Sequence, residues 1–286
     1  MWFSKAKTLS LLFVVFLPMT LFAGRVKHET LDVPPEGAKR VVVSVEFGAG
    51  EIWLTSGDID NVVEMEVTYD TRNIDFDHEY EVRNDVGDLI LESNHRDNKN
   101  IDTEDHKWDM TISQNYPLRF DLDIGACEAE MDLGGLQLEE FSLEVGAASA
   151  EIDFSSPNPI RLEEIRIEAG AASLEMRQIG NANFETLDFS GGVGSFDLDL
   201  RGKYTGESKV TIEVGLGSMD IILPRGLPVR VITEGANWLS SIDFHHDRLD
   251  EVDDDVYESP DFEDAEIRLI LDVEVGLGSI DLYWKR

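Results

Sequence analysis

Carboxylate side chains recur at fixed distances from a series of glycines, and they are the groups in this sequence best suited to bind ions or donate protons. The glycines are Gly48, Gly125, Gly146, Gly170, Gly192, Gly215 and Gly276. Two residues before them lie Glu46, Asp123, Glu144, Glu168, Ser190, Glu213 and Glu274. Five residues after them lie Trp53, Glu130, Glu151, Glu175, Asp197, Asp220 and Asp281. Because carboxylates bind hard cations, these two acidic rows could hold Ca²⁺ or Mg²⁺ weakly, but a solvated acidic face is the interpretation we favour.

Hydroxyl, thiol and imidazole groups show no arrangement typical of an active site. A catalytic serine would occur once and need a histidine base, whereas here a serine recurs after the glycine and indicates a turn residue. These serines are Ser149, Ser173, Ser195, Ser218 and Ser279. Cys127 stands where the other repeats have Gly or Ala, so we interpret it as a packed thiol.

Tighter metal sites are also disfavoured. The calcium-binding pattern G-G-x-G-x-D fails because Asp197 comes one residue late and would face the other way. His245–Asp247 and the nearby Asp253–Asp255 fit an exposed polar loop better than a transition-metal site, because adjacent strand residues point apart. The sequence therefore assigns no catalytic, cofactor-binding or metal-binding residue, and it predicts no cofactor.

Four tryptophans are spread along the chain after residue 50, namely Trp53, Trp108, Trp238 and Trp284. We expect them to fill or cap the core, since aromatic side chains are usually buried. A surface row of tryptophans that stacks on sugars is the alternative.

Composition excludes several classes of partner and fold. The 286 residues contain 59 Asp and Glu against 24 Lys and Arg, a formal charge of −35. Such a charge repels phosphates, which argues against binding to nucleic acid or to bare anionic membranes. A single cysteine excludes an intramolecular disulfide and a cysteine-based zinc site.

The elements that must position these side chains repeat with the glycines. FDLDIGACEAEMDL from Phe120, FSLEVGAASAEIDF from Phe141 and VTIEVGLGSMDIIL from Val210 align without gaps, at steps of 21 to 24 residues between Gly125 and Gly215. Apolar and polar residues alternate on both sides of the glycine, as in strands with one buried face. Each unit is therefore predicted to be a strand, a tight corner and a second strand. Stacking about seven such units gives a parallel β-solenoid, with a β-sandwich as the alternative.

Outside the repeats the chain divides into four further parts. Residues 1–23 combine Lys5 and Lys7 with an apolar stretch and are predicted to be a cleaved signal peptide, or else a retained anchor. Residues 24–39 are predicted to be a linker, and residues 40–119 an irregular β cap at the N-terminal side of the solenoid. The solenoid then covers residues 120–286, interrupted by an acidic insertion at residues 245–264. A degenerate repeat with Trp238 in the glycine position is expected to come before the last coil at Gly276.

The run from Trp108 to Phe154, WDMTISQNYPLRFDLDIGACEAEMDLGGLQLEEFSLEVGAASAEIDF, resembles the bacterial toast-rack family. The resemblance extends over about residues 40–286 and implies a right-handed β-solenoid like those of LiaF-type C-terminal domains and adhesin-type proteins. LiaF-type proteins carry membrane helices before the solenoid and act on a histidine kinase, whereas this sequence has only the signal segment. The family supplies no active-site residues to transfer.

These observations predict a non-catalytic, exported structural or interaction protein of the bacterial cell envelope, with a connection to envelope stress. Its partner is expected to be an envelope protein or a glycan. A polysaccharide-active enzyme is one alternative, because carboxylates in a solenoid groove can cleave glycans. An adhesin or self-associating surface protein is the other, as a monomer or as a homodimer formed through the last coil at Glu274–Trp284.

Overall fold

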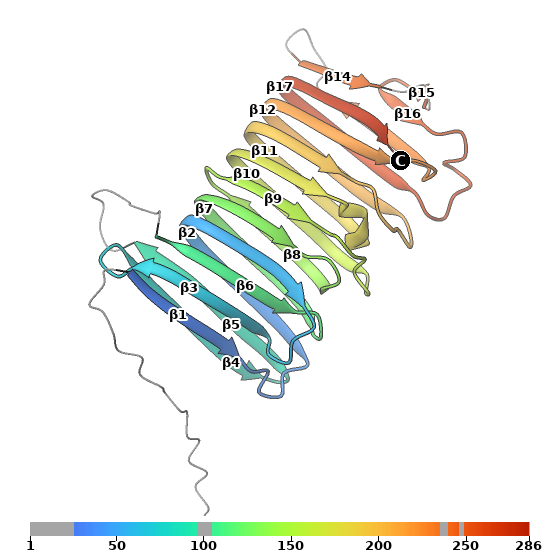
Figure 1. Ribbon diagram of the computed structural model, residues 1–286. Coiled ribbons are helices and arrows are strands. Elements are labelled where there is room, and N and C mark those ends of the chain that lie inside the picture. Colours follow the sequence, from blue (N-terminus) through green and yellow to red (C-terminus); the bar gives the residue numbers. More distant parts are fainter. Residues whose placement is uncertain (1–25, 96–104, 235–239, 246–248, 286) are drawn as a thin grey trace, which may run out of the picture.

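The computed structural model describes residues 26–95, 105–234, 240–245 and 249–285, and there the chain is built almost entirely of β-strands (Figure 1). Its one helical element in these ranges is a single 3₁₀ turn, η1 (Ile179–Ala182). The predicted signal peptide at residues 1–23, Trp238, His246 and Asp247 lie outside the described residues. No described segment forms a helix with the length and apolarity needed to cross a bilayer.

Six long strands carry the predicted repeats. They are β2 (Arg40–Gly57), β7 (Pro117–Asp132), β10 (Leu162–Arg177), β11 (Phe184–Asp199), β12 (Ser208–Pro224) and β17 (Leu269–Lys285). A seventh repeat is split at its corner into β8 (Gln137–Val145) and β9 (Ser149–Asp153). Each of the long strands passes through its glycine, and β2, β7, β10 and β17 change one of their partners there. β2, for example, pairs with one strand before Gly48 and with another after Gly50.

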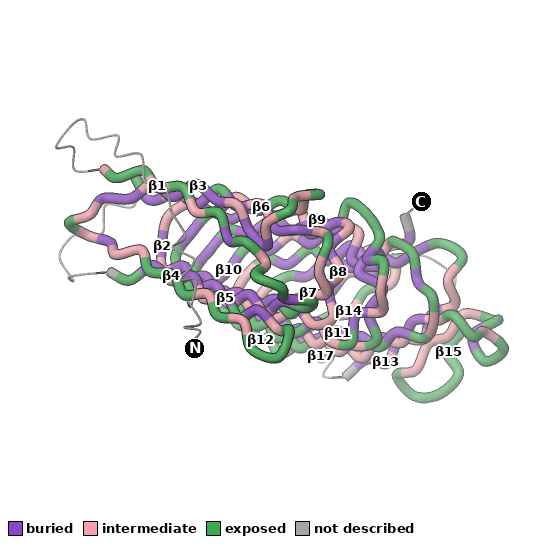
Figure 2. The backbone as a smooth tube through the Cα atoms, turned by 90° about the horizontal axis from the view of Figure 1, so that it is seen from below, coloured by how far each residue is buried: buried purple, intermediate pink, exposed green. Residues whose placement is uncertain are grey.

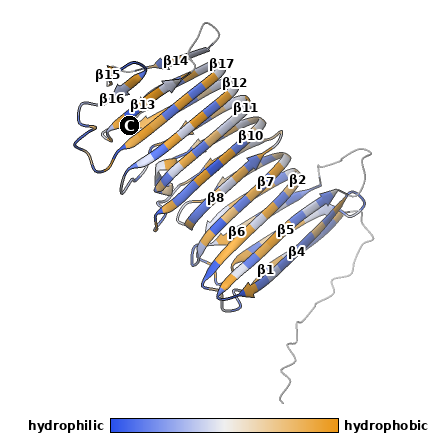
Figure 3. Ribbon diagram, turned by 180° about the vertical axis from the view of Figure 1, so that it is seen from behind, coloured by the Kyte–Doolittle hydropathy of each residue, from blue (hydrophilic) through white to orange (hydrophobic). Residues whose placement is uncertain are grey.

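Neighbouring repeats pair in parallel with the register that the aligned sequences predict. The column that begins at Phe120 continues in register through Phe141, Ile165 and Leu187. All four side chains are buried, and the rings of Phe120 and Phe141 stack with centroids 5.8 Å apart. Alternation of apolar and polar residues thus sets which face of each strand lies against the core, as the banding in Figure 3 shows.

The stacking order differs from the predicted one at residues 208–285. β17 pairs in parallel with β12 on one side and with β13 (Val229–Glu234) and β14 (Ser240–Phe244) on the other. The strand at residues 269–285 is therefore inserted between two earlier parts of the chain, and the prediction that it forms the last coil is wrong. The sequences at the corners explain why β17 pairs with β12. Both strands carry the run V-G-L-G-S, so their corners fit each other closely.

The acidic insertion at residues 245–264 contains a small hairpin. β15 (Asp250–Asp253) and β16 (Val256–Glu258) pair antiparallel, and β16 pairs antiparallel with β13. Arg230 of β13 anchors the insertion by donating to Glu258 and Glu263, each at 2.6 Å. The hairpin therefore extends the sheet beyond β13.

Five further strands of mixed direction lie before β7, namely β1 (Val26–Val33), β3 (Val63–Asp70), β4 (Ile74–Arg83), β5 (Val86–His95) and β6 (Lys107–Ser113). Four of them, β3 to β6, lie within the β cap predicted at residues 40–119. β2 pairs in parallel with β5 and β6, so the first long strand is also flanked on both sides.

The linker predicted at residues 24–39 is wrong for its first half. β1 pairs antiparallel with β3 along its whole length, from Val26 opposite Asp70 to Val33 opposite Val63. The Tyr69 hydroxyl donates to Glu29, and Val33 is buried. The edge of β3 would otherwise expose unpaired backbone groups, which β1 satisfies.

The core runs along the length of the stack between two layers of strand halves (Figure 2). Opposite the glycine corners it is closed by connecting loops with buried asparagines. The amide nitrogen of Asn158 donates to the Leu138 and Ala182 carbonyls at 2.8 and 3.2 Å, and that of Asn181 donates to the Phe154 carbonyl at 2.9 Å. These amides connect carbonyls of successive units of the stack, which fixes the spacing of the loops.

Candidate functional site

The two predicted rows of acidic residues run along the stack, and Ser190 leaves a gap in the row before the corner. In the row before the corner, Glu144 pairs with Glu168, and Glu213 pairs with Glu274. In the row after the corner, Glu151 pairs with Glu175. The second row continues without interruption through Asp197, Asp220, Asp281 and Asp243. The side chains point outward, as the period-two pattern predicts.

The rows do not converge on a point. No group of three or more His, Cys, Asp or Glu side chains in the described ranges has the geometry to hold a metal ion. Strand spacing explains this, because carboxylates in one row lie on a line about 4.8 Å apart rather than around a centre. Weak binding of divalent cations along the rows stays a hypothesis.

The row after the corner is interrupted by Trp53, and a groove lies beside it. Two adjoining hollows, of about 170 and 280 Å³, are both lined by Trp53, Glu130 and Glu151. Trp53 is half-buried, and its register neighbours are Glu130 of β7 and Asp109 of β6. The two hollows together form the Trp53 groove.

A lysine covers the indole from the β6 side. Lys107 Nζ lies 5.5 Å from the centroid of the Trp53 ring and forms an ion pair with Glu51 at 2.9 Å. The hollows are lined by residues of β2, β7, β9 and β10, on the other side of the indole from β6. Lys107 therefore packs on the indole from the side opposite the hollows.

The far end of the Trp53 groove contains two more carboxylates and a guanidinium. Asp132 accepts hydrogen bonds from the Ser155 hydroxyl at 2.7 and 2.8 Å, and Asp153 accepts one from the Gln178 amide at 3.2 Å. Burial, and secondarily the charge of Asp132, raises the pKa of Asp153. Arg177 donates to Glu151 at 2.5 Å and to Glu175 at 2.7 Å. The groove thus combines a flat aromatic surface, many acceptors and one fixed cationic donor.

The tryptophans divide between core and surface. Trp108 and Trp284 are buried, which confirms the core prediction for these two, and Trp108 packs edge-on against Phe47 with centroids 5.1 Å apart. Trp53 contradicts it by standing in an outward-facing column. Its offset from Gly48 signals this, because every other residue at that offset is an exposed or half-exposed acid.

Cys127 lies in the position that its sequence context predicts. It is 7% exposed, and burial raises the pKa of its thiol to about 12. The thiolate is therefore absent at neutral pH, which agrees with a packing role. The recurring serines pair in register as an outward row, for example Ser173 with Ser195 and Ser218 with Ser279.

His245 belongs to no metal group within the described residues. Its imidazole Nε2 lies 2.5 Å from Asp281 Oδ1, and its ring stacks on Tyr283 with centroids 4.5 Å apart. The exposed side chain thus packs on β17, while the rest of the predicted loop motif, His246 and Asp247, lies outside the described residues.

A ridge of exposed aliphatic side chains follows the corner of three adjacent strands, and the sequence interpretation missed it. Val193, Leu216 and Leu277 pair in register and are 52%, 47% and 41% exposed. Each stands one residue after its glycine, where the repeats before them carry Ala. The change from Ala to Val or Leu at this position is the sequence signal for the ridge, which lies between the two acidic rows.

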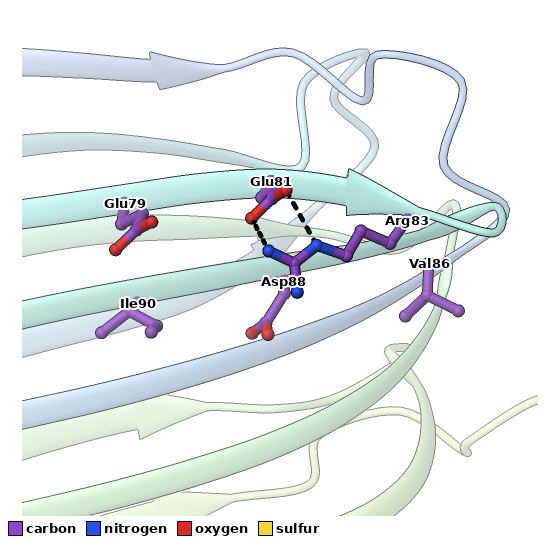
Figure 4. Close-up of a pocket in the computed structure, with 6 residues that line it drawn as sticks. All are labelled: Glu79, Glu81, Arg83, Val86, Asp88 and Ile90. Carbon is purple, nitrogen blue, oxygen red and sulfur yellow. Dashed lines mark hydrogen bonds and ion pairs between the residues drawn. The ribbon is translucent and has the colours of Figure 1, made fainter.

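A further hollow lies on the hairpin of β4 and β5, lined by Glu79, Glu81, Arg83, Val86, Asp88 and Ile90 (Figure 4). Arg83 binds both carboxylate oxygens of Glu81, at 2.8 and 2.5 Å. The guanidinium is thereby committed to an internal ion pair, so this hollow has fewer groups available to a ligand than the Trp53 groove.

The comparison with protein families decides the assignment. Residues 22–177 and 158–222 match the family model described as the N-terminal domain of toast_rack, DUF2154. The chain belongs to the toast-rack family. The match covers most of the long strands of this toast-rack chain, from β2 to β12, and the Trp53 groove lies inside it. A comparison with curated proteins finds no match.

Solved structures similar to this toast-rack chain come from several bacteria. A "putative cell adhesion protein" from Clostridium sporogenes is 18% identical with a TM-score of 0.45, covering 91% of this chain and 100% of the other. A "putative adhesin" from Bacteroides fragilis is 12% identical with a TM-score of 0.37, covering 91% and 98%. A "putative lipid binding protein" from Parabacteroides distasonis is 9% identical with a TM-score of 0.30, covering 91% and 97%. Similarities at this level do not identify a ligand.

Proposed function

We propose that this toast-rack chain is a non-catalytic interaction protein of the bacterial cell envelope, exported by the signal segment at residues 1–23 and wound as a right-handed parallel β-solenoid. One observation supports it above the others. The outward side chains repeat in register along the stack, giving long acidic rows, a serine row and an aliphatic ridge. Such a surface offers many equivalent contacts to an extended partner, whereas catalysis needs one singular constellation.

The proposal is tested in a bacterial host that produces the full chain with a C-terminal tag. We expect the protein in the envelope or exported fraction, with an N-terminus that begins after Ala23, and we expect the purified protein to sediment with isolated envelopes. Cytoplasmic protein of full length, or protein that stays in the supernatant, would overturn the proposal.

A polysaccharide-active enzyme is the second candidate, and the Trp53 groove is the observation that favours it. Asp153, whose pKa is raised by burial, pairs in register with Asp132, and glycoside hydrolysis uses two carboxyl groups of which one donates a proton. Incubation with envelope and plant polysaccharides followed by a reducing-end assay separates the two functions. If new reducing ends form with the unaltered chain and not with Asp153→Asn, the chain is an enzyme and the non-catalytic proposal is wrong.

A further inference from the structure

We propose that the Trp53 groove binds a glycan made of neutral or amino sugars. This inference deepens the proposed function and rests on it, because it names the ligand class of one site on the interaction surface. It is carried by the placement of Trp53 in an outward column, by the two hollows beside it and by the polar groups around them.

The indole supplies the flat apolar surface that a sugar ring needs. Pyranose rings expose C–H groups on one face, and these pack against aromatic rings, which carry negative charge density on their faces. Trp53 is held by Lys107 on its β6 side, so the surface toward Glu130 and Glu151 is the one that borders the hollows. A preformed aromatic surface loses little conformational entropy when a ligand binds.

Polar groups around the indole match the hydroxyl groups of a sugar. Glu130, Glu151 and Asp153 are charge-bearing acceptors, and Thr55 and Ser149 add hydroxyls that can donate or accept. Arg177 also lines the groove, and its ion pair with Glu151 fixes the orientation of the guanidinium there. A few placed polar groups around an apolar surface are typical of small-molecule and sugar sites.

Charge selects among sugars. The lining contains five carboxylates, Glu128, Glu130, Asp132, Glu151 and Asp153, against the single guanidinium of Arg177. Lys107 is paired with Glu51 and adds no net positive charge. Uronates, sulfates and phosphates are therefore repelled, whereas neutral sugars are accepted and protonated amino sugars are attracted.

The test uses the purified exported chain and calorimetric titration with three probes: oligomers of N-acetylglucosamine, oligomers of glucosamine and oligomers of galacturonate. We expect one or both of the first two to bind and galacturonate not to bind. Trp53→Ala should weaken the affinity about tenfold or more, which is what loss of one aromatic contact is worth. Trp53→Glu places in β2 the residue type that the other repeats carry there, so it should fold and also lose binding.

Asp220→Ala is the matched control, because Asp220 belongs to the same outward row but lies outside the groove. Its affinity should equal that of the unaltered chain, and thermal unfolding of every variant should show that the fold is kept. Absence of binding to both sugar probes overturns the glycan site, as does an affinity that Trp53→Glu leaves unchanged. If neither sugar binds but the unaltered chain still sediments with envelopes, the proposed function stands and only this site is removed.

Discussion

Gly217 lies at the corner of β12, close to the backbone of the neighbouring strand β11. Its φ is +149°, and a Cβ added there would lie 2.0 Å from the carbonyl oxygen of Gly194 in the neighbouring strand. Both the backbone conformation and the contact exclude a side chain, since the neighbouring atom is backbone and cannot move aside. Every repeat carries Gly, Ala or Cys two positions after its glycine, and this small size is thus a requirement for the stacking distance.

Gly217→Ala is therefore expected to lower the free energy of unfolding by about 2 kcal/mol or more. Gly226 also has a positive φ, +91°, but no atom lies within 4 Å of an added Cβ, so Gly226→Ala should cost only about 1 kcal/mol. Urea unfolding monitored by circular dichroism measures both. Equal losses in the two variants would contradict the steric argument.

Cys127 gives a prediction for alkaline pH. Because its thiol has a pKa of about 12 when folded and an ordinary value near 9 when unfolded, only the unfolded chain loses this proton between those values. The unfolded state then binds fewer protons, so the free energy of unfolding must fall as the pH rises from about 9 toward 12. The contribution is fully present below pH 9.

Urea unfolding of the natural chain and of Cys127→Ala at pH 7, 9 and 10.5 tests this. The stability of the natural chain relative to the variant should be constant from pH 7 to 9 and decline at pH 10.5, because Ala has no proton to lose. Iodoacetamide should label the thiol only after unfolding at pH 8. Rapid labelling of the folded chain would show that the thiol is accessible and contradict the packing role.

At the scale of elements, β17 lies between β12 and the pair β13 and β14, and this position changes the role expected of Trp284. A strand at the end of the stack would expose this residue, but it is 6% exposed, and the Arg225 guanidinium donates to its carbonyl at 3.2 Å. Trp284 is a core residue rather than part of a surface for self-association. A homodimer that forms through a strand edge would instead use a strand with one described partner, such as β14.

Trp284→Asp should therefore destabilise the protein by about 3–5 kcal/mol, because it buries a charge in place of an aromatic ring. Leu277→Asp on the same strand is the control, since Leu277 is exposed and should tolerate the change with little loss. Thermal unfolding and light scattering on both variants provide the readout. An unchanged melting temperature with a changed oligomeric state would restore the idea that β17 ends the stack.

The sequence could predict the repeats but not their neighbours. Alternation and the glycine column place the core residues of β7 to β12, because a strand half-buried in a stack needs that pattern whatever its partner is. The alternation is present both in residues 229–244 and in residues 269–285, however, so it does not by itself determine which of the two segments pairs with β12. The linker at residues 24–39 failed for a related reason, since the polar alternation of β1 reflects pairing with β3 at an edge rather than burial.

The Trp53 groove was predictable only in part. Its acidic side is contained in the predicted rows, whereas Trp53 was expected in the core because large aromatic residues usually are. Position in the repeat outweighs residue type here: an odd offset after the glycine places the side chain outside, where Lys107 and the neighbouring hollows accommodate an indole.

At the scale of the molecule, part of the acidic excess stands in lines along the stack, one on each side of the corner. Carboxylates on adjacent strands lie about 4.8 Å apart, well inside the Debye length of about 30 Å at 0.01 M salt and about 10 Å at 0.1 M. Repulsion between them opposes folding at low salt. Internal ion pairs such as Arg177–Glu151 relieve only part of it.

The melting temperature should therefore rise when NaCl is raised from 0.02 to 0.5 M. Differential scanning calorimetry measures it, and a series with CaCl₂ at matched ionic strength tests the cation hypothesis. An additional rise with Ca²⁺ would support weak binding along the acidic rows, whereas coincident curves would leave screening as the sole effect. A melting temperature that falls with NaCl would contradict the repulsion argument.

The inserted position of β17 also has a consequence for biosynthesis. Residues 208–244 leave the ribosome before residues 269–285 exist, so β12, β13 and β14 must wait without the strand that joins them. During that interval the nascent chain carries an open β12 edge, which is a template for mispairing with other chains. Holdase chaperones, or a passage through the export machinery before folding, would protect that edge until synthesis has passed residue 285.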